Sequence, residues 1–270
     1  MICFPHCKIN IGLDVVRKRP DGYHDIATVM FPVRGLCDSL EIVVPDGGAE
    51  GAELTVSGLG ADCPPQENIV VKAWQLMHEA YGIGGVRMHL HKAIPFGAGL
   101  GGGSADGAAA LRMLDTLFSV GAGIRRLEAL ALKLGSDVPF FLHDAPQLCS
   151  GRGEIMQPAG PDLKGCWLVL VKPEVSVSTA EAYAGIVPAE PAEPLLKRLA
   201  RPKESWRDHV TNAFEATVFG RHPGLATLKQ ALYDAGAFYA SMSGSGSSIY
   251  GLFTERPDRP TDERCWLLPL

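Results

Sequence analysis

The segment from Gly97 to Ser104 has a composition that suits phosphate binding. It reads Gly97-Ala-Gly-Leu-Gly-Gly-Gly-Ser104, with five glycines in seven positions. Glycine loses more backbone freedom on folding than any other residue, so this density would be costly in a segment without a purpose. Without Cβ atoms, successive N–H groups can turn toward phosphate oxygens, and the free N–H groups of a following helix add partial positive charge. The sequence therefore predicts a phosphate-binding segment made of main chain.

Three other interpretations of this segment compete with the first. It matches G-x-G-x-x-G, but a dinucleotide-binding turn should be followed by a strand and an acidic residue about 20 residues on, and here a second helix is expected instead. A P-loop requires a lysine before the serine, and Gly103 stands there. A plain tight turn remains the structural alternative. Ser104 could coordinate magnesium or a phosphate, or serve as a helix N-cap.

Two charged residues stand in apolar surroundings. Lys8 opens the aliphatic run 8–16, where a buried ammonium would need a partner, although an exposed edge position is the simpler alternative. Asp137 follows Gly135 and precedes Val138-Pro139. An aspartate there could accept a proton as a general base or cap a helix.

Tyr23 and His24 follow the turn signal Pro20-Asp-Gly22. The tyrosine ring could stack on a nucleotide base while the histidine hydrogen-bonds the base edge, or both could belong to an ordinary surface turn. His89 and His91 lie two residues apart on the same face of an expected strand. No third metal ligand is evident in the sequence, so we expect them to be surface histidines.

Four segments taken together resemble the GHMP kinase superfamily. They are Lys8-Ile-Asn10 with Arg19-Pro-Asp-Gly-Tyr-His24, then Pro95 to Asp106, then Gly135-Ser-Asp-Val-Pro-Phe-Phe141, and finally Ser243-Gly-Ser-Gly-Ser247. The glycine segment and the Ser/Gly segment mark only the superfamily. The stretches at 20–24 and 135–141 are similar to its branch that acts on a cytidine-diphosphate-linked methylerythritol.

The resemblance implies that ATP, with magnesium, phosphorylates the 2-hydroxyl of that substrate in non-mevalonate isoprenoid synthesis. It implies Lys8 and Asp137 as the catalytic pair. The implied substrate-binding residues are Asn10, Tyr23, His24, Thr179 and Tyr183. The implied ATP-binding residues are Asn68, Lys92, Pro95, Phe96, Gly97, Ala98, Gly99, Leu100, Gly101, Gly102, Gly103, Ser104 and Ala105. No protein metal site is implied.

Four positions depart from the family pattern, namely Cys7, Ala105, Ser136 and Ala213. Ala213 stands where an aspartate often follows the asparagine, so that aspartate has no role here. A homoserine-type or mevalonate-type kinase is the nearest alternative. A nucleotide-binding protein without catalysis is another, and the presence of Lys8 and Asp137 argues against it.

The elements that must position these residues follow from hydrophobic periodicity. Strands are expected at 8–16, 26–33, 40–44, 54–57, 86–92, 166–172 and on both sides of the Ser/Gly segment within 240–253. Helices are expected at 69–81, 107–118, 125–134, 178–186, 209–219 and 224–236. Without regular β-α-β alternation, the pattern predicts an α+β fold. We expect an ATP-binding domain at 1–150 and a second domain at 151–270, with the active site in the cleft between them.

The overall composition limits the possible partners. Hydrophobic residues make up 46% of the 270 and charged residues 20%, which is typical of a globular protein with a substantial core. The net charge of −5 argues against a nucleic-acid partner. The seven scattered cysteines form no C-x-x-C pair, and no apolar run is long enough to span a membrane. We expect a cytoplasmic monomer or weak homodimer that binds small molecules.

Overall fold

The computed structural model describes residues 1–59, 63–258 and 264–270. Internal contacts group the chain into two compact units. Unit 1 comprises Met1–Cys7, Leu36–Phe96 and Gly101–Asp144, and unit 2 comprises Lys8–Gly35, Gly97–Leu100 and Ala145–Leu270. The units interleave along the chain, whereas the expected domains 1–150 and 151–270 are consecutive segments. That division stays a prediction.

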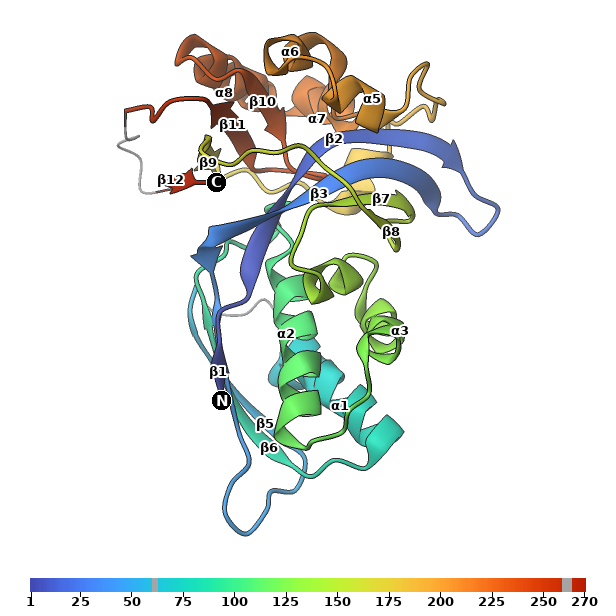
Figure 1. Ribbon diagram of the computed structural model, residues 1–270, viewed down its shortest axis with the longest axis vertical. Coiled ribbons are helices and arrows are strands. Elements are labelled where there is room, and N and C mark those ends of the chain that lie inside the picture. The colour runs from blue at the N-terminus through green and yellow to red at the C-terminus, as the bar shows by residue number, and fades with distance from the viewer. Residues whose placement is uncertain (60–62, 259–263) are drawn as a thin grey trace. The chain divides into compact units, whose positions relative to one another are not determined.

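Unit 1 contains a four-stranded sheet and three α-helices (Figure 1). The strand order is β1 (Ile2–Cys3), β4 (Ser39–Val43), β6 (Val86–Lys92) and β5 (Ala52–Gly58). The β5–β6 pair is parallel, and the other pairs are antiparallel. The helices are α1 (Ile69–Tyr81), α2 (Gly102–Leu117) and α3 (Ile124–Leu134), followed by a 3-10 helix at Val138–Leu142.

Strict alternation along β6 gives unit 1 its core. Val86, Met88 and Leu90 are buried, and the residues between them are exposed. They pack with Leu111 of α2 and Val70 of α1 in one apolar cluster. Lys92 continues the buried row, so the alternation itself carries a charged side chain into the interior.

Unit 2 contains two four-stranded sheets. One has the order β2 (His6–Lys18), β3 (His24–Cys37), β7 (Gln147–Gly151) and β8 (Ile155–Pro158), and the other β10 (Tyr239–Met242), β11 (Ile249–Phe253), β9 (Trp167–Val171) and β12 (Cys265–Pro269). The ends of β2 and β3 extend into unit 1. The helices are α4 (Thr179–Tyr183), α5 (Leu195–Leu199), α6 (Trp206–His209), α7 (Phe214–Arg221) and α8 (Pro223–Asp234).

The core of unit 2 joins its strands to its longer helices. Leu13 of β2, Val169 of β9, Ile249 of β11, Phe214 of α7 and Leu232 of α8 belong to one buried cluster. The mixture of antiparallel sheets and helices confirms the α+β class. Within the described residues, no helix combines the length and apolarity that a membrane span requires.

Most expected elements are present, and two differ in a way that affects the candidate site. The helix at 69–81 and the strand at 86–92 have the predicted bounds. Helix α2 begins at Gly102 and not at 107, because the N–H of Ala105 already donates to the carbonyl of Gly101 at 2.9 Å. The expected helix at 209–219 begins at Phe214, since Val210 is extended and Asn212 forms a bridge to Leu13 of β2.

Candidate active site

Residues 97–100 form a short loop that is fixed within unit 2 by main-chain hydrogen bonds. The N–H of Lys8 donates to the carbonyl of Leu100 at 2.9 Å, and the N–H of Ser248 donates to that of Ala98 at 3.2 Å. Gly99 has a φ of +73°, and a Cβ on it would lie 2.0 Å from the carbonyl oxygen of Ser243. Only glycine fits this position.

Residues 101–105 belong to unit 1 and form the first turn of α2. Gly101 is the N-cap in the left-handed region, with no side-chain hydrogen bond at the cap. Ser104 lies inside the helix, so the N-cap interpretation of Ser104 is wrong. Gly103 is exposed, and a Cβ on it would have no described atom within 4 Å. The N–H groups at this helix start have no intrahelical partners, which suits them to bind an anion.

Lys8 is buried, with 3% of its surface exposed. Its Nζ donates to Asn10 Oδ1 at 2.5 Å and to the carbonyl of Gly99 at 3.0 Å. The expectation of an exposed edge-strand lysine is therefore wrong. Asn10, also 3% exposed, donates through Nδ2 to Thr28 Oγ1 at 3.0 Å. This network holds the ammonium beside the glycine loop.

The Ser/Gly segment 243–247 also lies beside Lys8 and Gly99. Ser243 Oγ donates to the carbonyl of Gly99 at 2.8 Å and accepts the N–H of Asn10 at 3.3 Å. A Cβ on Gly244 would lie 3.2 Å from Asn10 Oδ1 and 3.5 Å from Lys8 Nζ. Two sequence-distant glycine-rich segments thus meet at Lys8.

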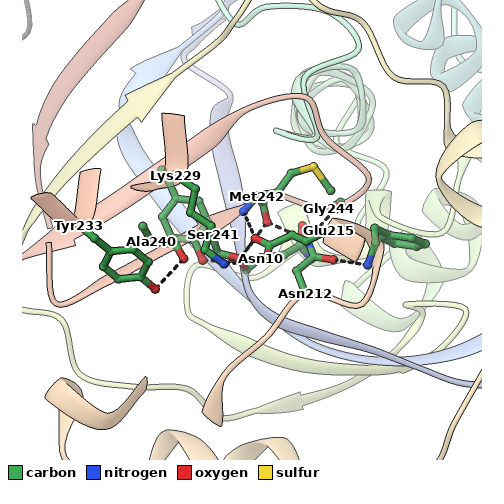
Figure 2. Close-up of polar contacts among 11 residues, drawn as sticks. Asn10, Asn212, Glu215, Lys229, Tyr233, Ala240, Ser241, Met242 and Gly244 are labelled. Atoms are coloured by element: carbon green, nitrogen blue, oxygen red, sulfur yellow. Dashed lines mark hydrogen bonds and ion pairs between the residues drawn. The ribbon is translucent and has the colours of Figure 1, made fainter. Parts of the chain in front are cut away.

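Figure 2 shows the side chains that hold the Ser/Gly segment in place. Asn212 Nδ2 donates to the carbonyls of Met242 and Gly244, both at 2.8 Å. Glu215 Oε1 accepts the N–H of Met242 at 2.8 Å, and its other oxygen accepts from Lys229 Nζ at 2.6 Å. Asn212 and Glu215 were not predicted as site residues, since nothing local in the sequence links them to 242–244.

Asp137 lies in unit 1, immediately before the 3-10 helix Val138–Leu142. It is partly exposed and occupies the N-cap position, but its side chain makes no capping hydrogen bond. Asp137 therefore occupies the cap position that the sequence allowed, without the side-chain hydrogen bond of a capping residue. Its catalytic role stays a prediction.

The predicted base-binding residues Tyr23, His24 and Tyr183 lie in unit 2. The rings of His24 and Tyr183 stack at 4.7 Å between centroids, and Phe214 contacts Tyr183 edge-on at 4.8 Å. Tyr23 is 55% exposed, and the guanidinium of Arg152 lies 4.6 Å from the centre of its ring. Arg152 was not predicted, because it comes from the turn between β7 and β8.

The other predicted binding residues differ in how far they are exposed. Thr179 is exposed and is the first residue of α4. Asn68 is 8% exposed, and its Oδ1 accepts the N–H of Val70 at 3.1 Å as the N-cap of α1. Pro95 and Phe96 are partly buried and lie directly before the glycine loop. His89 and His91 are exposed as expected, and both contact Ser57 Oγ.

Lys92 belongs to a buried charged triad with Asp38 and Asp106. Its Nζ donates to Asp38 Oδ2 and, at 2.6 Å, to Asp106 Oδ2. All three side chains are at most 2% exposed. Burial raises the pKa of Asp106 to about 8; the Lys92 ammonium opposes this rise and the Asp38 carboxylate adds to it. Of the three residues, only the lysine was predicted from the sequence.

The glycine loop and the first turn of α2 offer main-chain donors, and Lys8 offers a buried ammonium beside the loop. Among the residues that the structure describes, no group of three or more histidine, cysteine, aspartate or glutamate side chains could hold a metal ion. Magnesium keeps several waters and is commonly held through substrate phosphates, so the donor set fits a cation that arrives with a nucleotide.

Comparisons with known proteins show the family of the chain. Residues 68–145 match the model of the GHMP kinases N terminal domain, and residues 193–266 match that of the GHMP kinases C terminal domain. A 4-diphosphocytidyl-2-C-methyl-D-erythritol kinase from Parabacteroides distasonis is 46% identical over 257 residues, which cover 95% of this chain and 93% of that protein.

Solved structures give the same result. The crystal structure of a 4-(cytidine 5'-diphospho)-2C-methyl-D-erythritol kinase matches with a TM-score of 0.77 and 34% identity, over 93% of this chain and 90% of that one. A homoserine kinase from Cytophaga hutchinsonii matches with a TM-score of 0.68 and 21% identity, over 93% and 85%. The second match shows a shared fold alone.

Proposed function

The chain belongs to the GHMP kinases, within the family of 4-diphosphocytidyl-2-C-methyl-D-erythritol kinases, and from this we propose its reaction. It transfers the γ-phosphoryl group of ATP to the 2-hydroxyl of 4-diphosphocytidyl-2-C-methyl-D-erythritol. The reaction belongs to the non-mevalonate synthesis of isoprenoid precursors.

One observation carries the proposal beyond the family relationship. The Lys8 ammonium is buried and held between Asn10 and the carbonyl of Gly99, at the place where the glycine loop meets the Ser/Gly segment. A fixed positive charge beside a main-chain phosphate site is the arrangement that phosphoryl transfer needs, because catalysis of this reaction depends on positioning and electrostatics.

The roles of the two catalytic residues follow from their chemistry. Asp137 accepts the proton of the substrate hydroxyl as the general base. Lys8 stabilises the charge that develops on the attacking oxygen. The stretch 135–141, which contains Asp137, is one of the two that resemble this branch of the kinases, and this supports the assignment.

The substrate side is assigned to the aromatic residues of unit 2. Tyr23 and Tyr183 provide faces on which a cytosine ring stacks, and His24 hydrogen-bonds the base edge. Thr179 lies on the same helix as Tyr183, and Asn10 faces the acceptor alcohol beside Lys8. The exposed Tyr23 ring with Arg152 over one face supports this assignment.

ATP is the co-substrate, with its phosphates on the N–H groups of residues 97–104. The remaining residues assigned to ATP binding are Asn68, Lys92, Pro95, Phe96 and Ala105. Magnesium supplies charge neutralisation of the phosphates when it is bound, and phosphates and water are its main ligands. The seven cysteines are scattered along the sequence and form no C-x-x-C pair, which suits a reducing compartment such as the cytoplasm.

A comparison of acceptors tests the proposal. We expect ADP release in a coupled assay with 4-diphosphocytidyl-2-C-methyl-D-erythritol, and none above background with homoserine or mevalonate. Mass spectrometry of the product should show one added phosphoryl group. ADP release with homoserine or mevalonate alone would contradict the substrate assignment. ATP binding without turnover on any acceptor would favour a nucleotide-binding protein without catalysis.

A further inference from the structure

The buried triad of Lys92, Asp38 and Asp106 contains two acidic groups and one basic group. Two carboxylates face one ammonium, and none of the three side chains has more than 2% of its surface exposed. Asp106 Oδ1 is buried and has no hydrogen-bond partner among the described residues. An unpartnered oxygen costs less on a neutral carboxyl than on a carboxylate, so the surroundings favour a proton on Asp106.

The triad is connected to the phosphate-binding backbone at two points. Asp38 Oδ1 accepts the N–H of Ala93 at 2.6 Å and that of Ile94 at 2.8 Å, which fixes the chain between β6 and the glycine segment. Lys92 Nζ lies 5.2 Å from the centre of the Phe96 ring. On the other side, a Cβ on Gly102 would lie 3.4 Å from Lys92 Nζ, so the ammonium packs against the first residue of α2.

Asp106 lies one helical turn below the free N–H groups at the start of α2. Its protonation state therefore sets the net charge under that helix end. When Asp106 holds a proton, the triad is neutral. When the proton is lost, one uncompensated negative charge lies beneath the place where an anion binds.

We propose that Asp38, Lys92 and Asp106 are positioning residues for phosphate binding: they fix the backbone that enters the glycine segment, and a proton retained on Asp106 keeps the first turn of α2 attractive to the triphosphate. This inference rests on the proposed function, since ATP is taken as the ligand. By linkage, bound ATP makes the proton on Asp106 harder to remove, and loss of the proton weakens ATP binding.

The titratable groups that face Asp106 come from two strands and from the residue directly before a third. Lys92 comes from β6, Asp38 from the residue before β4, and Cys3 from β1. Burial and the charge of Asp106 raise the pKa of Cys3 to about 11, so the thiol stays neutral where Asp106 titrates. Helices α1 and α3 present the apolar Ile69 and Leu134 to the neighbouring Gly107.

The test is the pH dependence of nucleotide affinity. The dissociation constant of a non-hydrolysable ATP analogue with magnesium is measured by calorimetry above about pH 7, where a terminal phosphate with a second pKa near 6 no longer changes charge. The expected size follows from the repulsion between an ionised Asp106 and the bound phosphate. For two unit charges roughly 8 Å apart, at an effective dielectric constant near 20, this repulsion weakens binding about thirtyfold. Screening by salt reduces the effect to about tenfold. We expect this weakening in the parent protein as the pH rises through the titration of Asp106.

Asp106→Asn removes the titrating group and keeps the shape, so its affinity for the analogue should not change with pH. Cys3→Ser is the matched control and should keep the parental dependence. The same pH dependence in the parent and in Asp106→Asn would overturn the inference. Failure of the parent to bind the analogue at about pH 7 would instead count against the proposed function.

A second measurement covers the case in which Asp106→Asn does not fold. Adenosine carries no phosphate, so its affinity for the parent protein should be independent of pH while that of the ATP analogue falls. Equal pH dependence for both ligands would show that the charge below α2 does not act on the phosphates.

Discussion

Lys8 illustrates what burial does to a charged residue at the start of a strand. A lysine in an apolar run is compatible with an exposed edge or with a partnered interior position, and the exposed fraction of 3% decides between them. Its Nζ donates to Asn10 Oδ1 and to the carbonyl of Gly99, which are both neutral acceptors. An ammonium held in this way is fixed in place by the protein and is not merely solvated.

At the scale of a single residue, the prediction concerns the role of Asp137 as the general base. Replacing Asp137 by asparagine keeps the shape and removes the proton acceptor, so turnover should fall by at least roughly 100-fold, the scale of general-base catalysis. Affinity for an ATP analogue should stay near that of the parent, because we propose that main-chain N–H groups, and not Asp137, hold the phosphates. The coupled ADP-release assay and calorimetry measure the two effects.

Asp162→Asn is the matched control for this substitution. Asp162 is an exposed carboxylate whose Oδ1 accepts the N–H of Lys164 at 2.9 Å. Its substitution should leave turnover unchanged. If Asp137→Asn turned over as fast as the parent, Asp137 would have no part in the mechanism.

At the scale of elements, the glycine loop depends on its contact with the Ser/Gly segment. Asn212 and Glu215 hold the backbone at 242–244, and Ser243 in turn contacts Gly99. Two loops that belong to distant parts of the sequence therefore support each other. The close approach of their main chains requires a residue without Cβ at position 99.

Gly99→Ala should disrupt this contact. Alanine would need a φ of +73° and would place its Cβ 2.0 Å from a main-chain oxygen that cannot rotate away. We expect the free energy of unfolding to fall by at least about 2 kcal/mol, from left-handed strain and forced backbone displacement. Urea denaturation followed by circular dichroism measures the change.

Gly103→Ala is the control within the same segment. Position 103 lies in the first turn of α2, and the described atoms leave open space around the added methyl group. Because alanine favours helix over glycine by up to about 1 kcal/mol, this variant should be as stable as the parent or more so. Equal loss of stability at both positions would mean that the contact with Ser243 is not the cause.

At the scale of the whole molecule, Asp106 links protonation to folding. Its pKa lies near 8 in the folded protein and at the ordinary 3.8 when unfolded, so the folded chain binds more protons between these values. The contribution of Asp106 to stability is therefore full at low pH and is lost as the pH rises toward 8. The slope is up to about 1.4 kcal/mol per pH unit.

This dependence is measured as the difference in unfolding free energy between the parent and Asp106→Asn. Relative to the variant, the parent should become less stable as the pH rises from about 5 to about 8. Subtracting the variant removes the contributions of other titrating groups. A difference that does not change with pH would show that Asp106 is ionised throughout this range.

The sequence by itself determined the local elements and the family. Apolar periodicity sets the bounds of α1 and β6, because each depends on neighbours within the same segment. The density of glycine at 97–103 predicts a phosphate-binding segment, because few other uses justify its entropic cost. The early start of α2 was not predictable from glycines 102 and 103, which are poor helix formers. Their N–H groups at the first turn need no intrahelical partner.

The tertiary structure alone decided which side chains surround these elements. Lys92 meets Asp38 and Asp106, which are 54 and 14 residues away in sequence, and Asn212 reaches main-chain atoms 30 and 32 residues away. Arg152 covers Tyr23 from a turn that carries no recognisable motif. Such contacts depend on how strands are paired and helices packed. Local periodicity specifies which face of an element is buried, but not which distant residue lies against it.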